Sequence, residues 1–492
     1  MGKAKSRPRA ACQVIDLTDF IPAHPPRFTE TPSAWRRLQA GRKNFLAMWE
    51  EEAFETDVSM IRILLRQALL CNNPESVQYA FSIKNESFER KSPQMRFALS
   101  PLLGDGLFVS DGEIWRQRRK IITPIVHISQ LGRFAPAMID VANEASERWS
   151  AMDGQTIDVL NETAKMTAEI ICRAVFGQKL GHDFASQIVD GFSEYQRLID
   201  QIDLFAWLSI PDWVPRRKNW AIQSSVQRIH AVLTEVIEKC RIQKDSGEYA
   251  IIHRLFDARD ESGRPLSDAA IRNEIAVLFM AGHETTANSL TWSWYLISQA
   301  PEVEAKLHYE LERVLGGRTP TLADVPELIY TRAIFEEAMR LYPPVPILPR
   351  EALVDEQFKT LRIPKGTLVF VVPWLLHRHK NLWDRPDHFV PERFLPDAAA
   401  KISKFAYVPF SIGPRVCAGL SFGLHEAILC LATLAQRFTL RLANGHEVMP
   451  VCRLTTRPDG GMPMVLQTRE RKTMAPTAVP DAVAACPYHH NA

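Results

Sequence analysis

The sequence predicts a mainly α-helical protein with a small β-rich region, on three observations. From about residue 74 to 315, apolar residues recur mainly at helical spacing. One helix is especially clear, because Ser267 offers an N-cap, apolar residues recur from Ile271 onward, and Pro301 ends a run of more than thirty residues. Strand-like segments lie at 361–372 and within 438–468.

The remaining elements follow from local patterns. The apolar stretch 58–71 is interrupted by Arg62, Arg66 and Gln67, so it is expected to form two short strands of a hairpin rather than a membrane span. Three further helices are expected at about 302–315, 325–341 and 418–438. The polar residues 1–30 and 472–492 are expected to be flexible tails.

Composition excludes several classes of protein. Apolar residues make up 46% of the chain and charged residues 24%, as in an ordinary globular protein. A formal net charge of +2 indicates no nucleic-acid partner. No early apolar run approaches the roughly 18–20 residues of a transmembrane anchor, and no signal peptide follows the basic N-terminus. Eight scattered cysteines, without CxxC or zinc spacing, favour a reducing compartment, and hence the cytoplasm.

The segment 410–419, Phe-Ser-Ile-Gly-Pro-Arg-Val-Cys-Ala-Gly, is the most informative in the chain. A thiolate at Cys417, on a turn that leads into a helix, is stabilised by backbone amides and the helix dipole and makes a good metal ligand. Gly413 and Gly419 would let the main chain pass close to a flat ring system, and Arg415 can bind an anionic group. A buried, unreactive cysteine is the plain alternative, but it does not explain these neighbours.

This segment resembles the haem-binding loop of the cytochrome P-450 family, the haem-thiolate monooxygenases. The family's Phe410, Gly413, Arg415, Cys417 and Gly419 positions all match, and further motifs place the resemblance over about 50–470. It implies a triangular single domain, residues 31–471, with haem between the long central helix and the helix after the cysteine. Cys417 would be the axial ligand of the iron. The haem would be non-covalent haem b, because no Cys-x-x-Cys-His attachment motif occurs.

A second motif, Ala-Gly-His-Glu-Thr-Thr at 281–286, lies midway along the long helix. Glycine and β-branched threonines weaken a helix, and a threonine hydroxyl that bonds a preceding carbonyl can open a kink. In the family a widened turn here holds oxygen and water, with Glu284 as the acid and Thr285 as the alcohol that deliver protons. A kink beside a surface glutamate is the alternative. His283 is expected not to ligate, because in the family Gly282 faces the haem and the next residue points elsewhere.

A third motif places Glu337 and Arg340 three residues apart on one helical face with apolar neighbours. On an exposed helix such a pair contributes little. In the family it is buried and is completed by an arginine downstream, here Arg393 in Pro-Glu-Arg-Phe. The resemblance therefore implies a structural triad that holds this helix against the loop leading to Cys417.

Trp115 and Arg119 lie four residues apart, so both can reach one carboxylate. In the family these positions bind a haem propionate, and Arg350 matches another propionate-binding position. With Arg415, three arginines would serve two carboxylates.

Three basic residues alternate with that pair: Arg116, Arg118 and Lys120. They are expected to face outward. A solvated face is the ordinary interpretation, and a docking surface for an acidic electron-transfer protein is the alternative.

By resemblance, the substrate pocket is lined by residues 95–108, 192–220, 345–348 and 455–464. Their apolar composition favours a hydrophobic small molecule, and fatty acids, terpenoids and xenobiotics all stay open.

The resemblance thus implies a monooxygenase that inserts one atom of O₂ by hydroxylation or epoxidation. No fused redox module follows in the sequence, so electrons are expected from a separate ferredoxin, flavodoxin or flavoprotein reductase. A peroxide-driven or isomerising haem-thiolate enzyme is one alternative, although the Glu284-Thr285 pair disfavours it. A non-catalytic sensor that binds haem and a lipophilic ligand is another.

Overall fold

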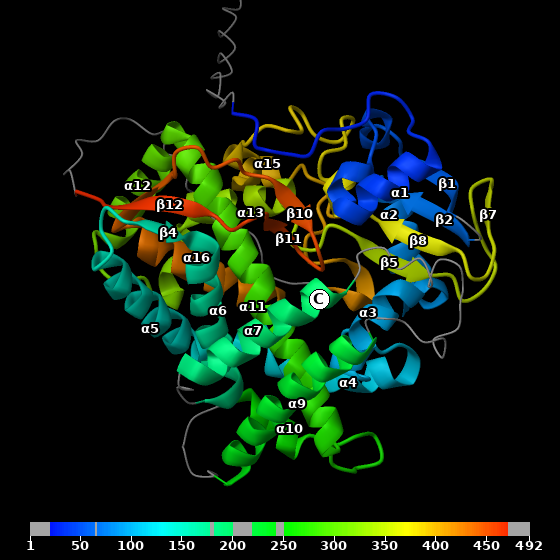
Figure 1. The fold of residues 1–492 in the computed structure, drawn as a ribbon, viewed down its shortest axis with the longest axis horizontal. Helices are drawn as coiled ribbons and strands as arrows, with labels where there is room; N and C mark the ends of the chain where they lie inside the picture. The colour runs from blue at the N-terminus through cyan, green and yellow to red at the C-terminus, as the bar shows by residue number, and fades with distance from the viewer. Residues whose placement is uncertain (1–19, 64–65, 178–181, 200–218, 243–249, 471–492) are drawn as a thin grey trace, which may run out of the picture.

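The structure, a computed structural model, describes residues 20–63, 66–177, 182–199, 219–242 and 250–470 (Figure 1). The helices of the first half are α1 (Ala34–Lys43), α2 (Pro74–Gln78), α3 (Pro93–Leu103), α4 (Gly112–Ile125), α5 (Leu131–Ser150), α6 (Val159–Phe176), α7 (His182–Leu198) and α9 (Asn219–Ile242). Those of the second half are α10 (Ile251–Asp257), α11 (Asp268–Gln299), α12 (Pro301–Leu315), α13 (Ile329–Leu341), α14 (Pro373–Leu376), α15 (Pro396–Ala399) and α16 (Leu420–Ala435). The mainly helical class predicted from the sequence is confirmed.

The strands form small sheets on the edge of the helical body, as Figure 1 shows. A five-stranded sheet has the order β1-β2-β8-β5-β3, in which only β2 and β8 run parallel. A three-stranded sheet has the order β4-β12-β9, and β6-β7 and β10-β11 are separate pairs. The strand bounds are β1 (Val58–Ile63), β2 (Arg66–Cys71), β3 (Arg90–Lys91), β4 (Thr156–Asp158), β5 (Leu348–Glu351) and β6 (Glu356–Phe358). The others are β7 (Leu361–Ile363), β8 (Leu368–Val371), β9 (Phe438–Leu442), β10 (Pro450–Cys452), β11 (Thr456–Pro458) and β12 (Pro463–Thr468).

Most predicted elements are present with shifted ends. The hairpin is β1 and β2, paired antiparallel from Val58 opposite Cys71. The helix expected from residue 325 begins only at Ile329, after a 3₁₀ segment at Leu322–Glu327. There the Glu310 carboxylate of α12 accepts the amides of Tyr330 and Thr331, at 2.6 and 2.8 Å, and so caps the first turn of α13. A cap supplied by another helix leaves no local signal in the sequence.

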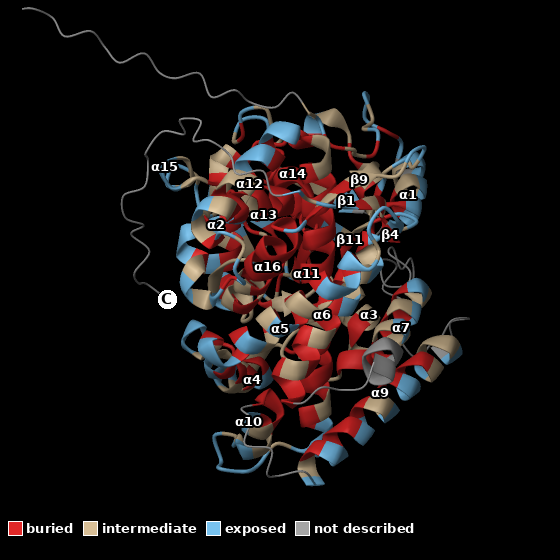
Figure 2. Ribbon diagram, turned by 90° about the vertical axis from the view of Figure 1, so that its left-hand side faces the viewer, coloured by how far each residue is buried: buried red, intermediate tan, exposed pale blue. Residues whose placement is uncertain are grey.

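Helix α11 lies at the centre of the molecule. It spans 32 residues, and the Ser267 hydroxyl accepts the Ala270 amide as the predicted N-cap. It packs against α6, α13 and α16, and Figure 2 shows α11 and α16 buried side by side. One apolar core includes residues from Leu46 to Leu466. An aromatic stack of Trp292 on Tyr342, with centroids 3.8 Å apart, joins α11 to the end of α13.

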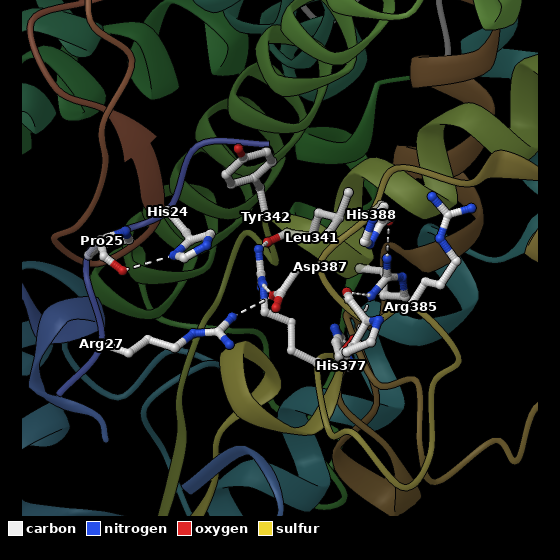
Figure 3. A network of polar contacts seen from close by, with 12 residues as sticks. His24, Pro25, Arg27, Leu341, Tyr342, His377, Arg385, Asp387 and His388 are labelled. Carbon is white, nitrogen blue, oxygen red and sulfur yellow. Dashed lines mark hydrogen bonds and ion pairs between the residues drawn. The ribbon is translucent and has the colours of Figure 1, made fainter. Parts of the chain in front are cut away.

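The expected N-terminal boundary at residue 30 is wrong, because residues from 20 onward pack on this core. The Tyr342 hydroxyl donates to the Ala23 carbonyl at 2.7 Å, and Phe389 donates to the Phe20 carbonyl at 3.2 Å. Figure 3 shows Arg27 pointing toward Asp387, 2.5 Å away. These partners lie more than three hundred residues away in sequence, so no local pattern could reveal them. The remaining tail residues, 1–19 and 472–492, lie outside the described part of the chain.

A polar cluster joins the loop between α3 and α4 to α11. The buried Glu274 carboxylate accepts the Leu107 amide at 3.1 Å and lies 3.3 Å from Arg118. Asn273 donates to Asp105 at 2.9 Å, and Arg118 also pairs with Asp105 at 3.2 Å. Burial raises the pKa of Glu274 to about 7, although the Leu107 amide and Arg118 oppose this shift and Asp105 adds to it. Glu274 therefore titrates near neutral pH.

Glu274 should make stability depend on pH. Its folded pKa exceeds its ordinary value of 4.5, so the folded protein holds a proton that the unfolded chain has released. The free energy of unfolding should then fall as pH rises from about 4.5 to about 7. Glu274→Gln removes this pH-dependent contribution to stability. The melting temperature of the variant minus that of wild type should therefore increase as pH rises from about 4.5 to about 7. The exposed Glu261→Gln is the control; a Glu274→Gln difference that is constant with pH would contradict the assignment.

Candidate functional site

The loop before α16 holds Cys417 in a defined turn. The Cys417 amide donates to the Phe410 carbonyl at 2.9 Å, and Ser411 and Gly413 have positive φ angles of 61° and 74°. Helix α16 begins at Leu420, three residues after the cysteine. The thiol thus lies at a helix N-terminus, as the sequence predicted.

The charge state of the Cys417 thiol reflects three influences. Burial raises its pKa, whereas the Gly419 amide and the Arg119 charge lower it. Arg119 also donates to the Val416 carbonyl at 2.8 Å, so it braces the same turn. The side chain has accessible surface although protein atoms surround it, and the two observations agree if the thiol faces an enclosed space.

Gly413 has a different neighbour from the one expected. A Cβ there would lie 1.9 Å from the Phe81 carbonyl oxygen, so the glycine admits the backbone of residue 81 rather than a flat ring. At Gly419 a Cβ would meet no atom within 4 Å. Of these two glycines, only Gly419 has free space where the main chain could lie close to a ring system.

Two buried or partly buried cations beside this loop, Arg350 and Lys91, form no ion pair among the described residues. Arg350 is buried, with one terminal nitrogen unpartnered, and burial followed by the charge of Arg415 lowers its pKa to about 9. Lys91 pairs with Arg350 across β3 and β5, and burial lowers the pKa of Lys91 well below its usual range. No ion pair joins either residue to a carboxylate among the described residues. Arg350 and Lys91 therefore suit a ligand that brings negative charge.

Arg415 and Trp115 lie together next to these cations. The Arg415 guanidinium stacks over the Trp115 ring, 4.6 Å from its centroid. Arg415 donates to the Glu89 carbonyl at 2.9 Å and to the Ser110 carbonyl, while its Nε has no partner. Lys91 was missed in the sequence, because a single lysine in a two-residue strand carries no motif.

The outward orientation expected for the basic run on α4 is wrong for one residue. Arg116 and Lys120 are exposed, but Arg118 is buried against Glu274 and Asp105. Arg118 lies three residues from Trp115, which places it on the same buried face of the helix. Two exposed cations are left for the docking interpretation.

On α11, the Glu284 carboxylate is held by one residue from each of two other elements. The Thr455 hydroxyl donates to its Oε1 at 2.6 Å, and the Gln196 amide of α7 donates to its Oε2. The Thr285 hydroxyl donates to the Ala281 carbonyl at 2.6 Å, as expected, while the helix continues unbroken. The widened turn stays a prediction. Gln196 and Thr455 belong to two of the expected pocket segments, 192–220 and 455–464. Residues 200–218 of the first segment lie outside the described residues.

His283 packs on a residue of its own helix, and Gly282 faces α6. The His283 ring stacks on Phe279 at 5.6 Å, and burial lowers its pKa to about 4. These are the contacts of a packed core histidine. A Cβ at Gly282 would lie 3.0 Å from Ile171 of α6. This glycine lets α6 and α11 approach. The expectation that Gly282 faces the haem stays a prediction.

The structure brings Glu337, Arg340 and Arg393 together. Arg340 makes two bonds to the fully buried Glu337, at 2.6 and 2.7 Å, and Arg393 lies 3.5 Å from the same carboxylate. Arg340 also donates to three carbonyls of the segment before the Cys417 loop, those of His377, Pro386 and His388, at 2.6–2.9 Å. These carbonyl bonds, which no motif encodes, tie α13 to that segment.

Comparison with known proteins decides the family. The Cytochrome P450 family model matches residues 25–463. The chain belongs to the cytochrome P450 family. It is 33% identical to cyclooctatin synthase of Streptomyces melanosporofaciens over 80% of this chain and 85% of that protein. It is 30% identical to cyclooctat-9-en-7-ol 5-monooxygenase of the same organism, over 92% and 95%.

The fold matches as well. The crystal structure of the cytochrome P450DA heme domain superposes with a TM-score of 0.76 at 25% identity, covering 92% of this chain and 98% of that one. The protein is therefore a cytochrome P450 monooxygenase whose cofactor is haem. The residues fit that group, because a thiol at a helix N-terminus offers an iron ligand. Arg350 and Arg415, each with one buried nitrogen that has no hydrogen-bond partner among the described residues, and the neighbouring Lys91 offer positive charge for two propionates.

Two features were not found among the described residues: a membrane-spanning helix and a cluster of metal-binding side chains. Within the described ranges, none of the helices is long and apolar enough to cross a bilayer. The same part of the chain contains no group of three or more side chains arranged to hold a metal ion directly.

Arg340→Ala should yield little soluble, haem-loaded P450. It strands the buried Glu337 and removes the donors to three carbonyls, and an unpaired buried charge costs roughly 3–5 kcal/mol. Arg332→Ala is the matched control on the same helix, because the Arg332 side chain is exposed, and its loss leaves only the partly exposed Glu336 without its partner at 3.1 Å. Haem content per protein, from absorbance, measures the result. Normal loading of Arg340→Ala would show that the triad is dispensable.

Proposed function

We propose that this P450 inserts one atom of O₂ into a hydrophobic small molecule, by hydroxylation or epoxidation. One observation carries the proposal: Cys417 precedes α16, and α16 packs directly on α11, which carries Glu284 and Thr285. An iron ligand and a proton-delivering pair thereby lie on two adjoining helices.

The proposed roles follow from the contacts. Cys417 would hold the haem iron, and Arg350, Arg415, Arg119, Trp115 and Lys91 would surround the propionates. When bound, haem supplies oxygen activation, which a thiolate ligand promotes by donating electron density.

On the other side, Glu284 is oriented by Thr455 and Gln196, and so is fixed beside Thr285. Thr285 holds its hydroxyl against Ala281, from which it can turn to pass a proton. Phe410 and Gly419 shape the turn at the thiol.

The substrate is proposed to be largely hydrocarbon. The predicted pocket segments are apolar, and one relative is named for a reaction on cyclooctat-9-en-7-ol, a cyclic alkenol by its name. A cyclic, terpenoid-like compound is therefore the first class to screen, followed by fatty acids and xenobiotics.

The electron donor is proposed to be a separate ferredoxin, flavodoxin or flavoprotein reductase. The exposed Arg116 and Lys120 would contribute to docking an acidic partner. A cytoplasmic location, favoured by six free cysteines among the described residues, stays a prediction.

The two alternative functions, a peroxide-driven or isomerising enzyme and a haem-binding sensor, require different features of the site. A peroxide-driven or isomerising enzyme has no use for a proton relay, and the ordered bonds to Glu284 count against it. A haem-binding sensor would bind hydrophobic ligands without product formation, so turnover with a surrogate redox pair separates it from an enzyme.

Cys417→Ala tests the metal ligand. Wild-type protein should give the red-shifted Soret band of thiolate ligation in the reduced carbon-monoxide difference spectrum, and the variant should lose it. Cys430→Ala, a buried core thiol on α16, is the matched control and should keep the band. An unchanged band in Cys417→Ala would exclude this ligand.

Thr285→Ala tests the relay. Haem binding, substrate binding and reduction should persist, while electrons from NAD(P)H are diverted to hydrogen peroxide. The ratio of product to NAD(P)H consumed should fall visibly, since general acid–base positions typically contribute about 10²–10⁴-fold. Thr285→Ser keeps the hydroxyl and should restore the ratio. Equal ratios in all three proteins would leave Thr285 a packing residue and favour the peroxide-driven alternative.

A further inference from the structure

Glu426 is a carboxyl group buried in the middle of α16 that no step above uses. Its exposed fraction is 0%, and neither carboxyl oxygen has a hydrogen-bond partner among the described residues. The neighbouring positions of the helix, from Ala427 to Ala435, are almost all apolar and buried. An ionised carboxylate in such surroundings costs several kcal/mol, whereas a neutral acid with one hydrogen bond costs far less.

Among the described residues, no cation acts on Glu426. The Thr286 hydroxyl of α11 is the polar group that acts on it, and it only partly offsets burial, which raises the pKa of Glu426 well above its usual range. Cys430, one turn further along α16, is the titratable group on which Glu426 acts. Helices α5, α12 and α13, strand β9 and the Leu322–Glu327 segment also pack on α16, but none of their described side chains shifts this pKa. Arg332 of α13 acts on His425 instead.

The two helices approach closely at this point. Gly423 lies one turn before Glu426, and a Cβ at that glycine would be 3.7 Å from the Thr286 hydroxyl oxygen. Thr286 is itself buried and directly follows Thr285. A bond between Glu426 and Thr286 would therefore join the helix that follows the thiol to the turn that carries Glu284 and Thr285.

We propose that Glu426 is an un-ionised carboxylic acid whose O–H bonds the Thr286 hydroxyl oxygen, and that it is a positioning residue holding α11 against α16. The functional part of this inference rests on the proposed monooxygenase reaction, since it assigns Glu426 the task of keeping the Thr285 turn in place relative to Cys417. A small rotation of the carboxyl group completes the bond, because Thr286 is the polar side chain that already faces it.

The first experiment needs no turnover. An infrared difference spectrum of haem-loaded wild type minus Glu426→Gln, at neutral pH, should show the C=O stretch of a protonated carboxylic acid. Thr286→Val removes the partner hydroxyl and should shift this band, whereas Gly423→Ala, which adds a methyl group in ordinary contact at the same interface, should leave it in place. The absence of the acid band from wild type would overturn the proposal.

Thermal unfolding tests the protonation state of Glu426 independently, through the direction in which stability changes with pH. Because the acid's pKa is raised on folding, wild type should lose stability relative to Glu426→Gln as pH rises above about 4.5. The melting temperature of Glu426→Gln minus that of wild type should therefore increase from acidic to alkaline pH. A decrease would mean that the carboxylate is charged and paired, and would overturn the proposal.

The functional arm compares two variants by the ratio of product to NAD(P)H consumed. Glu426→Gln keeps a donor and the shape and should retain this ratio. Glu426→Leu lacks the donor and should lower it about tenfold, as for other residues that orient a metal site from outside. An unchanged ratio in a folded, haem-loaded Leu variant would remove the positioning role. If Glu426→Leu does not fold, an unchanged ratio in Thr286→Val, which loses the same bond, would remove that role equally. The infrared and unfolding measurements do not depend on the proposed monooxygenase reaction. Failure of the Glu426 proposal can therefore be distinguished from failure of the proposed function.

Discussion

The arrangement of the site depends on one buried ion pair, Glu337 with Arg340. Both side chains are fully buried, so the pair is stable only because every remaining donor of Arg340 meets a carbonyl and the Val390 amide meets Glu337. Those carbonyls belong to residues 377–388, which lead toward the cysteine turn. The same segment receives Arg27 through Asp387, so the N-terminal residues are anchored to it as well. A charge pair that is costly in isolation thus specifies how a long irregular segment lies on α13.

Near the Cys417 turn, the buried cations depart from the usual rule that a buried charge lies beside an opposite charge. Arg350 and Lys91 have no acidic partner among the described residues, and burial lowers the pKa of both. Such an arrangement suits an anionic ligand, and the two propionates of haem would supply that charge. Arg119, which is also proposed to lie near the propionates, in addition braces the turn through Val416 and lowers the pKa of Cys417.

The opposite side of the site is organised by hydrogen bonds. Glu284 has bonds from α7 and from the turn between β10 and β11, so its orientation depends on two elements that meet only in the folded protein. The bond proposed for the buried Glu426 would add a neutral acid between α16 and α11. Together these contacts make the position of Thr285 a property of the whole helical packing rather than of its own helix.

Local patterns in the sequence were enough for the elements and the chemistry. Helical periodicity and the Ser267 cap predicted α11. The resemblance around Cys417 and Glu284 implied which residue types would lie near the haem, and that around Glu337 implied a structural triad. Only the tertiary structure decided where individual side chains point. Arg118 is buried although its neighbours Arg116 and Lys120 are exposed, and Lys91 joins the cation group. Gly413 and Gly282 allow close approach of Phe81 and Ile171. The physical reason is that periodicity reports which face of an element is apolar, whereas close approaches and ion pairs arise between residues distant in sequence. Their partners are set by packing, which a single chain read in order does not contain.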